Sequence, residues 1–154
     1  MLYYRPHRLA SNKLIARDSG DTLCTLCDTT KLAEIIHEGS TMRVVRNRMP
    51  YDIFEDLRVN DHLMIVPKQH RTSFGEFTTD EKIEYIDLVA EYEGNFYNIY
   101  TRSRGTVTRS VTHLHTHLIQ TKGQRLRAIV YINKPYLVLH GTRLKELVKL
   151  GKKR

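Results

Sequence analysis

Three histidines alternate with other residues in the segment His113-Leu-His115-Thr-His117. In an extended strand the side chains point to the two faces in turn, so all three imidazoles are expected on one face. Neutral imidazoles packed so closely are poor core residues because each has two ring nitrogens to satisfy, and three cations would repel one another. An imidazole is a nucleophile, a hydrogen-bond donor and a metal ligand near neutral pH. The pattern therefore indicates a chemical site.

The chain has two cysteines, in the segment Cys24-Thr-Leu-Cys27. A single close pair favours metal binding or redox chemistry over a disulfide framework. A thioredoxin-like redox pair would follow a strand and open a long helix, whereas this pair follows the polar stretch 17–22. The placement suits half of a zinc site, whose other two ligands must come from elsewhere in the chain.

The elements that position these residues are strands on both sides of one helix. The segments 32–37 and 41–47 are expected to form a hairpin with its turn at Gly39 and Ser40, and a short helix over 29–37 is the competing interpretation. Residues 51–61 are expected to form a polar, irregular loop that leads to a buried strand over 62–67.

A helix is predicted for residues 79–93. Thr78-Thr-Asp-Glu81 is a capping box, Ile83, Ile86, Val89 and Ala90 recur at helical spacing, and Gly94 is a stop signal. The segments that follow are rich in β-branched and aromatic residues and are expected to form an antiparallel meander. These segments are 96–101, 111–119 and 126–132. A short strand over 136–140 and a basic amphipathic helix over 143–150 complete the pattern, which indicates an α+β fold.

The length of 154 residues, 40% of them hydrophobic, suits one domain of ordinary size. We divide it into an N-terminal arm (1–21), the main domain (22–140) and a basic C-terminal tail (141–154). No apolar run approaches the roughly 20 residues of a membrane span, and the N-terminus lacks the apolar stretch of a secretory signal. A cytoplasmic protein is expected.

The net charge is +8, and no acidic residue occurs between Gly94 and Lys145. Fixed positive potential there favours a phosphate-bearing ligand, although a solvated basic face without a ligand is the simpler interpretation. The terminal run Lys149-Leu-Gly-Lys-Lys-Arg154 makes nucleic-acid binding conceivable, but so short a tail is weak evidence.

The sequence resembles the histidine triad (HIT) family of nucleotidyl hydrolases and transferases, whose signature is His-φ-His-φ-His-φ-φ with φ apolar. The segment 113–119 matches it, with Thr116 as a mild departure. The segment 62–70, which ends in Pro-Lys-Gln-His70, resembles the family's strand ending in Pro-Lys-x-His, and Asn47-Arg-Met-Pro50 resembles its ribose-binding loop. The resemblance covers residues 20–132 and implies a HIT-like antiparallel meander with one long helix and one or two short ones.

The resemblance implies a mechanism and a role for each matching residue. By position, His115 is the nucleophile that attacks the α-phosphorus of a nucleotide ester, anhydride or amidate and forms a covalent nucleotidyl-histidine. His117 and Ser110 would donate hydrogen bonds to phosphate or leaving-group oxygens, and Asn47 would hold the ribose. His62, at the start of its strand, is expected to make a structural hydrogen bond.

The resemblance also implies a structural zinc ion bound by Cys24, Cys27, His70 and His113, a closed Cys₂His₂ set. Two buried thiols beside unrelated histidines are the alternative. A homodimer is implied as well, and no membrane partner is expected.

The chain departs from the family pattern at several positions. Thr108-Arg109 replaces the frequent Gly-Gln, so Arg109 is a candidate to clamp a polyphosphate, or it points to solvent. Gln120 replaces a frequent Pro after the triad, and the stretch from Asn47 to His62 is longer than usual. The third histidine, His117, favours the hydrolase branches over the uridylyltransferase-like branch.

Two other functions compete with hydrolysis. One is a catalytically silent HIT-like module that binds a nucleotide or RNA through the same residues. Its weakness is that a silent binder has little need of His115 between two further histidines. The other is a catalytic metal held by all three histidines, which is weakened because alternate residues on a flat strand converge poorly on one ion.

Overall fold

The computed structural model describes residues 24–106, 109, 111–126, 128–133 and 136–141. The predictions for the arm 1–21, for Ser110 and for the helix over 143–150 lie outside this part of the chain. None of the helices in the described part is long and apolar enough to cross a membrane.

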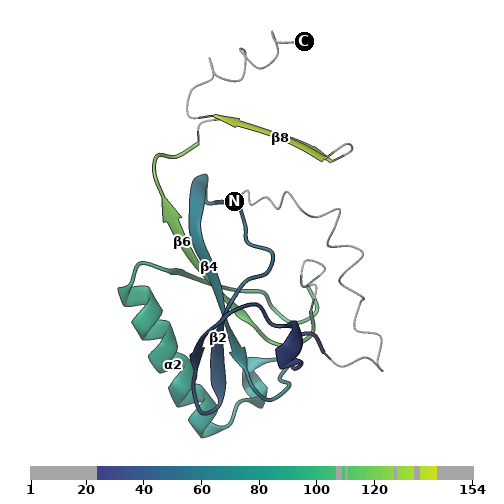
Figure 1. The fold of residues 1–154 in the computed structure, drawn as a ribbon, viewed down its shortest axis with the longest axis vertical. Helices are drawn as coiled ribbons and strands as arrows, with labels where there is room; N and C mark the ends of the chain where they lie inside the picture. The colour runs from purple at the N-terminus through teal and green to yellow at the C-terminus, as the bar shows by residue number, and fades with distance from the viewer. Residues whose placement is uncertain (1–23, 107–108, 110, 127, 134–135, 142–154) are drawn as a thin grey trace.

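The main body is a six-stranded antiparallel sheet with one long helix against it, which confirms the predicted α+β class (Figure 1). The strands run in the spatial order β1-β2-β4-β6-β5, and β3 pairs with β4. Their bounds are β1 Ile35–Glu38, β2 Met42–Arg46, β3 Ile53–Phe54, β4 Leu57–Pro67, β5 Asn98–Thr101 and β6 Thr116–Lys122. Two short 3₁₀ helices, η1 (Thr29–Lys31) and η2 (Phe74–Glu76), lie in the connections.

The first hairpin forms as predicted, with β1 and β2 joined through Gly39 and Ser40. The competing helix over 29–37 is limited to the three residues of η1, capped by the side chain of Asp28. β4, the longest strand, pairs with β2 on one side and with β6 on the other. The predicted buried strand over 62–67 is the fully buried half of β4.

The expectation of an irregular loop over 51–61 is wrong. β3 pairs with the beginning of β4 through Phe54 and Leu57, so Glu55 and Asp56 form a two-residue hairpin turn. Both turn residues have positive φ, 49° and 64°, the backbone of a type I′ turn that usually carries Asn-Gly. The sequence Glu-Asp does not give that turn signal, so local sequence does not predict the hairpin.

The predicted meander is correct only for its first two strands. β5 and β6 pair within the main sheet, whereas β7 (Ala128–Asn133) pairs with β8 (Tyr136–Gly141) in a separate two-stranded sheet. Strand periodicity identifies strands but does not specify which sheet they join, because pairing partners are chosen by long-range contacts.

The helix α2 (Thr79–Gly94) begins at Thr78 with the predicted capping box and packs on one face of the sheet. Its Leu88 and Tyr92 join Met42, Leu63 and other strand residues in the larger core cluster. Ile83 and Ile86, whose spacing helped to predict the helix, are on the opposite side, 56% and 60% exposed. Apolar side chains therefore lie on both sides of the helix, a property that a helical spacing by itself does not reveal.

Glu84 of α2 holds the turn of the first hairpin. It accepts hydrogen bonds from the Ser40 hydroxyl at 2.7 Å, the Thr41 amide at 2.7 Å and the Thr41 hydroxyl at 2.5 Å. A Cβ on Gly39 would collide with Glu84 Oε1, so glycine permits this close approach. Burial acts to raise the pKa of Glu84, but the hydrogen bonds from Thr41 and Ser40 outweigh it and lower the pKa to about 2.

We expect Glu84→Gln to destabilise the protein at pH 7 by about 1 kcal/mol, because Gln retains one acceptor but loses the charge-assisted bonds. The folded pKa lies below the ordinary value of 4.5, so this stabilisation is present above pH 4.5 and is lost as the pH falls toward 2. Thermal melts of both proteins across this range check the prediction. A difference in melting temperature that stays constant between pH 7 and pH 3 would contradict it.

Candidate functional site

The three triad histidines lie where β6 begins. β6 starts at Thr116, so His113 and His115 precede the regular strand and His117 lies in it, opposite Met64 of β4. Leu114 and Leu118 belong to the core under α2. The histidines occupy the alternate positions, as the predicted two-residue periodicity requires, although the strand over 111–119 begins later than expected.

The surroundings of Thr116 explain how a polar residue can occupy a position that is apolar in the family signature. Its buried hydroxyl lies 3.0 Å from the hydroxyl of Tyr85 on α2 and 2.7 Å from that of Thr101 on β5. The polar group is therefore satisfied inside the core. This network ties the back of the triad strand to the helix.

The ring of His115 is held in one tautomer by the backbone. Its Nδ1 lies 2.8 Å from the carbonyl oxygen of His113, and because a carbonyl only accepts, Nδ1 carries the proton and donates it. In the neutral ring Nε2 is then unprotonated and nucleophilic. The side chain is buried, with 9% of its surface exposed.

His117 is oriented by His62 of the neighbouring strand. The backbone amide of Tyr51 donates to His62 Nδ1 at 3.0 Å, so the proton of the His62 ring is on Nε2. His62 Nε2 lies 3.0 Å from His117 Nδ1 and donates to it. The proton of a neutral His117 is then on Nε2, which leaves an N–H donor beside His115, whose ring centroid is 5.0 Å away.

Two tyrosine rings enclose His117. Tyr100 of β5 stacks on it with centroids 5.9 Å apart, and Tyr51 lies at 5.5 Å. Arg102 donates to the hydroxyl of Tyr51 at 3.0 Å, and its guanidinium lies 5.9 Å from the centre of the Tyr100 ring. Neither tyrosine belongs to a motif that the sequence marks. The sequence shows only that each tyrosine lies in or beside a predicted strand. That these strands belong to the sheet that carries His117 becomes known only from the strand order.

Asn47 follows β2 and lies next to His62. Its Oδ1 accepts from the amide of Met49 at 2.9 Å, so its Nδ2 faces His62. With the proton of His62 on Nε2, the 3.0 Å approach of Asn47 Nδ2 to that nitrogen is a contact between two N–H groups and not a hydrogen bond. The structure thus brings Asn47 to the histidine cluster, and ribose binding stays a prediction. The expected structural hydrogen bond of His62 is present, but His62 also contacts His117 directly.

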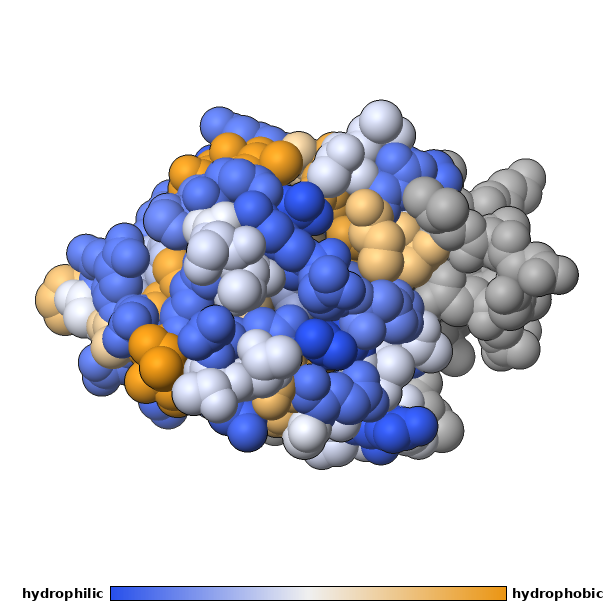
Figure 2. Space-filling model, turned by 90° about the horizontal axis from the view of Figure 1, so that it is seen from below, coloured by the Kyte–Doolittle hydropathy of each residue, from blue (hydrophilic) through white to orange (hydrophobic). Residues whose placement is uncertain are grey.

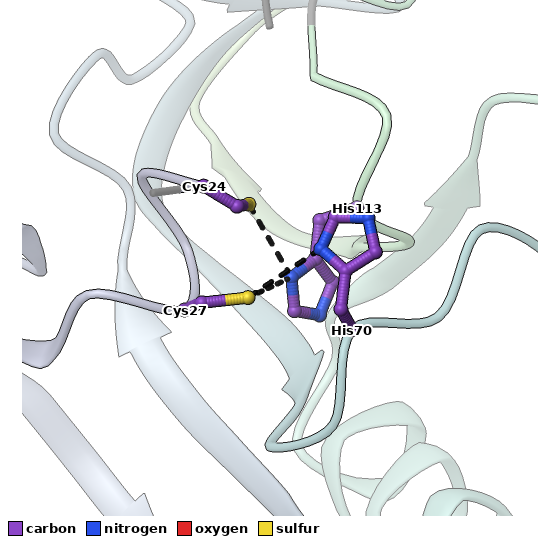
Figure 3. A group of neighbouring side chains, drawn as sticks. All are labelled: Cys24, Cys27, His70 and His113. Atoms are coloured by element: carbon purple, nitrogen blue, oxygen red, sulfur yellow. Dashed lines mark hydrogen bonds between the residues drawn. The ribbon is translucent and has the colours of Figure 1, made fainter. Parts of the chain in front are cut away.

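Cys24, Cys27, His70 and His113 come together although they are far apart in the sequence, and they could hold a metal ion (Figure 3). Their ligand atoms all lie within 4.8 Å of one another. Nδ1 of His113 is 3.5 Å from Sγ of Cys24 and 3.3 Å from that of Cys27, and Nδ1 of His70 is 3.4 Å from Sγ of Cys27. Figure 3 shows the four side chains pointing toward a common centre.

The second nitrogen of His113 fits a metal-binding role. Nε2 lies 3.0 Å from the carbonyl oxygen of Pro67 and must donate to it, which leaves Nδ1 unprotonated and facing the thiols. Burial, followed by the nearby His70, lowers the pKa of His113 to about 4. The ring is therefore neutral near neutral pH, the form that binds metals.

The loops that carry these ligands are anchored on both faces of the sheet. Leu26, between the two cysteines, packs with Val45, Met64 and Val66 on the face opposite α2. Beside His70, Arg71 donates to the buried carboxylate of Glu81 at 3.0 Å. Its carbonyl accepts from the Leu114 amide at 2.6 Å. Arg71 thus links the α2 N-terminus to the triad segment, while the cysteine turn is held by the opposite face of the sheet.

Arg109 adopts a third arrangement beside the two expected from the sequence. Its side chain turns back on its own segment and donates to the carbonyl oxygens of Val111 at 3.1 Å and Thr112 at 2.5 Å. It therefore braces the segment that leads into His113. A contact of Arg109 with substrate stays a prediction, as does the role of Ser110, which lies outside the described residues.

Solved structures with a similar chain trace include a hypothetical protein from Leishmania major, with a TM-score of 0.52, 17% identity and coverage of 84% of this chain and 92% of that one. A HIT family hydrolase from Clostridium thermocellum matches with a TM-score of 0.46, 23% identity and coverage of 66% and 94%. The histidine triad nucleotide-binding protein from Candida albicans matches at 0.45, 16%, 85% and 94%. At these identities the likeness is one of fold.

No protein-family model matches the chain, and no curated protein sequence matches it.

Proposed function

We propose that this chain is a HIT-type nucleotidyl hydrolase or transferase that works through a covalent nucleotidyl-histidine on His115. The observation that carries the proposal is the hydrogen bond from His115 Nδ1 to the His113 carbonyl, because it leaves Nε2 unprotonated on a ring flanked by a second histidine. A silent binding module needs neither this tautomer nor this neighbour.

In the proposed reaction the lone pair of His115 Nε2 attacks the α-phosphorus, and the bond from that phosphorus to the leaving group breaks. The leaving group departs with the bonding electrons and takes up a proton. A water molecule or another acceptor then attacks the phosphorus, releases the nucleotide and restores the neutral imidazole. Two displacements replace one difficult step.

Stabilising the negative charge on the phosphoryl oxygens is the larger task in such a transfer. The hydrogen-bond donors around His115 therefore matter as much as the nucleophile. His117 offers its Nε2 proton, which is fixed by the contact with His62. Ser110 would add a hydroxyl and Asn47 a ribose contact. The nearby Arg102 and the absence of acidic residues from 94 to 145 favour an anionic substrate.

The substrate class we propose is a nucleotide with a cleavable α-phosphate bond, either a dinucleoside polyphosphate or a nucleoside phosphoramidate. The resemblance in the triad segment supports the class.

We propose that the metal held by Cys24, Cys27, His70 and His113 is zinc with a structural role. Two thiolates and two imidazoles form a donor set that zinc prefers, and four protein ligands leave no open position for a reactant. Such an ion would crosslink the cysteine turn, the loop after β4 and the triad segment. A homodimer, which the resemblance implies, is also proposed, and sedimentation of the purified protein tests it.

The contact between His62 and His117 leads to a prediction. His62→Leu should lower kcat about 100-fold with little change in KM, because the proton on His117 is no longer directed toward the substrate. His62→Gln should recover part of the loss, because its amide can still donate to His117 Nδ1. Steady-state kinetics with melting temperatures for both variants measure this. If Leu and Gln reduce kcat equally in folded proteins, the proton-directing role is wrong.

The decisive experiment is intact-mass analysis of the purified protein during turnover of a panel of adenylated compounds that includes dinucleoside polyphosphates and an adenosine phosphoramidate. The expected result is a mass increase of one nucleotidyl group that is stable at neutral pH and lost in acid, as a phosphoramidate on imidazole is. Turnover with an unmodified mass throughout would overturn the covalent mechanism. No turnover of any compound, with binding retained, would favour the silent module.

A further inference from the structure

The outward face of α2 carries an apolar ridge that nothing in the described part of the chain covers. Ile83 and Ile86 are 56% and 60% exposed, and Ala90 is also exposed. Spacings of three and four residues place these side chains next to one another along the helix, on the side away from Leu88 and Tyr92. Large exposed apolar side chains are few among the described residues, and the face in Figure 2 is largely hydrophilic with small apolar patches.

Acidic side chains flank this ridge. Asp80, Asp87, Glu91 and Glu93 are all exposed, and none of them forms an ion pair with another described residue. Across Thr79–Gly94 there are six acidic residues and one lysine. We call the apolar ridge together with its acidic flanks the acidic ridge: Asp80, Ile83, Ile86, Asp87, Ala90, Glu91 and Glu93.

The C-terminal segment 142–154 has the complementary composition. It contains six basic residues and one acidic residue, and Leu144, Leu147 and Val148 recur at the spacing of one apolar helix face. A partner that fits the acidic ridge needs an apolar stripe flanked by positive charges, and this segment has both. We propose that segment 142–154 docks on the acidic ridge of α2, with its leucines against Ile83 and Ile86.

The same charges disfavour the most obvious competitor, the α2 helix of a second copy. Two such helices would bring two strongly acidic faces together, with only Lys82 of each to offset them. The basic segment of either the same chain or a second copy meets the ridge without that repulsion. This surface is separate from the triad, so the inference does not depend on the proposed catalytic function.

Carbodiimide crosslinking of the full-length protein, followed by peptide mass spectrometry, tests the proposal. The expected products join lysines of segment 142–154 to Asp80, Asp87, Glu91 or Glu93. Raising the NaCl concentration from about 0.05 M to about 0.5 M should lower their yield, because the screening length shortens severalfold. Dilution distinguishes docking within one chain from docking between copies, and both results support the proposal.

The variant Ile83→Ser/Ile86→Ser should reduce these crosslinks about tenfold, because the apolar contact is lost while every carboxylate remains. Both side chains point to solvent, so the variant is expected to fold, and circular dichroism verifies this. Ile35→Ser/Ile36→Ser is the matched control, since each of these β1 residues is 40% exposed and distant in sequence. The control should leave the crosslinks to α2 unchanged.

Three results would overturn the proposal. The first is the absence of crosslinks between segment 142–154 and α2. The second is crosslinks to α2 whose yield is unchanged in Ile83→Ser/Ile86→Ser. The third is crosslinks between Lys82 and carboxylates of a second α2, which would assign the ridge to contacts between copies.

Discussion

His115→Asn should abolish turnover, with kcat/KM falling by at least about 10⁴-fold, while the protein still binds nucleotide. The amide of Asn can replace the Nδ1 donor to the His113 carbonyl, but it offers no nitrogen lone pair that attacks phosphorus. The phosphate and ribose contacts proposed for His117, Ser110 and Asn47 are not removed. Single-turnover kinetics and equilibrium binding of a non-hydrolysable nucleotide measure the two properties separately.

The matched control is His37→Asn, which changes an exposed histidine on the edge strand β1. It should have wild-type rates, so a general effect of losing an imidazole is excluded. A folded His115→Asn protein that still turns over substrate at more than about 1% of the wild-type rate would remove His115 from the role of nucleophile.

Cys27→Ser should lose the bound metal and lower the melting temperature by about 10 °C or more, because metal binding at a closed site is part of the folding free energy. Cys27 lies near both His70 and His113, so its loss weakens the attachment of two segments. As isolated, the wild-type protein should contain about one zinc ion per chain. Metal analysis and thermal melts provide the measurements.

The loss of metal should also reduce activity beyond the effect on stability. The carbonyl of His113 positions the His115 ring, so a displaced His113 no longer orients the proposed nucleophile. Thr25→Ser, within the same cysteine turn, is the control and should keep both metal and activity. If a Cys27→Ser protein has normal melting behaviour, or if chelation of wild-type protein leaves its melting temperature unchanged, the structural metal proposal fails.

The sequence by itself determined the parts of this protein that depend on local rules. The two-residue alternation correctly separated the histidines from Leu114 and Leu118, which lie in the core under α2, because successive residues of an extended chain point to opposite faces. The capping box at Thr78 correctly marked the start of α2, because it satisfies the first free amides of a helix. The resemblance, which matched short local motifs, named the four residues of the Cys/His cluster.

Only the tertiary structure decided the relations that depend on packing between distant segments. The pairing of β4 with β6 sets His62 against His117 and so fixes the proton of the His117 ring on Nε2. The arrangement of Tyr51, Tyr100 and Arg102 around His117, and the choice of which apolar face of α2 is buried, follow from the same packing. Hydrophobic spacing cannot choose between two apolar faces, because the choice depends on the surface that the sheet presents to the helix.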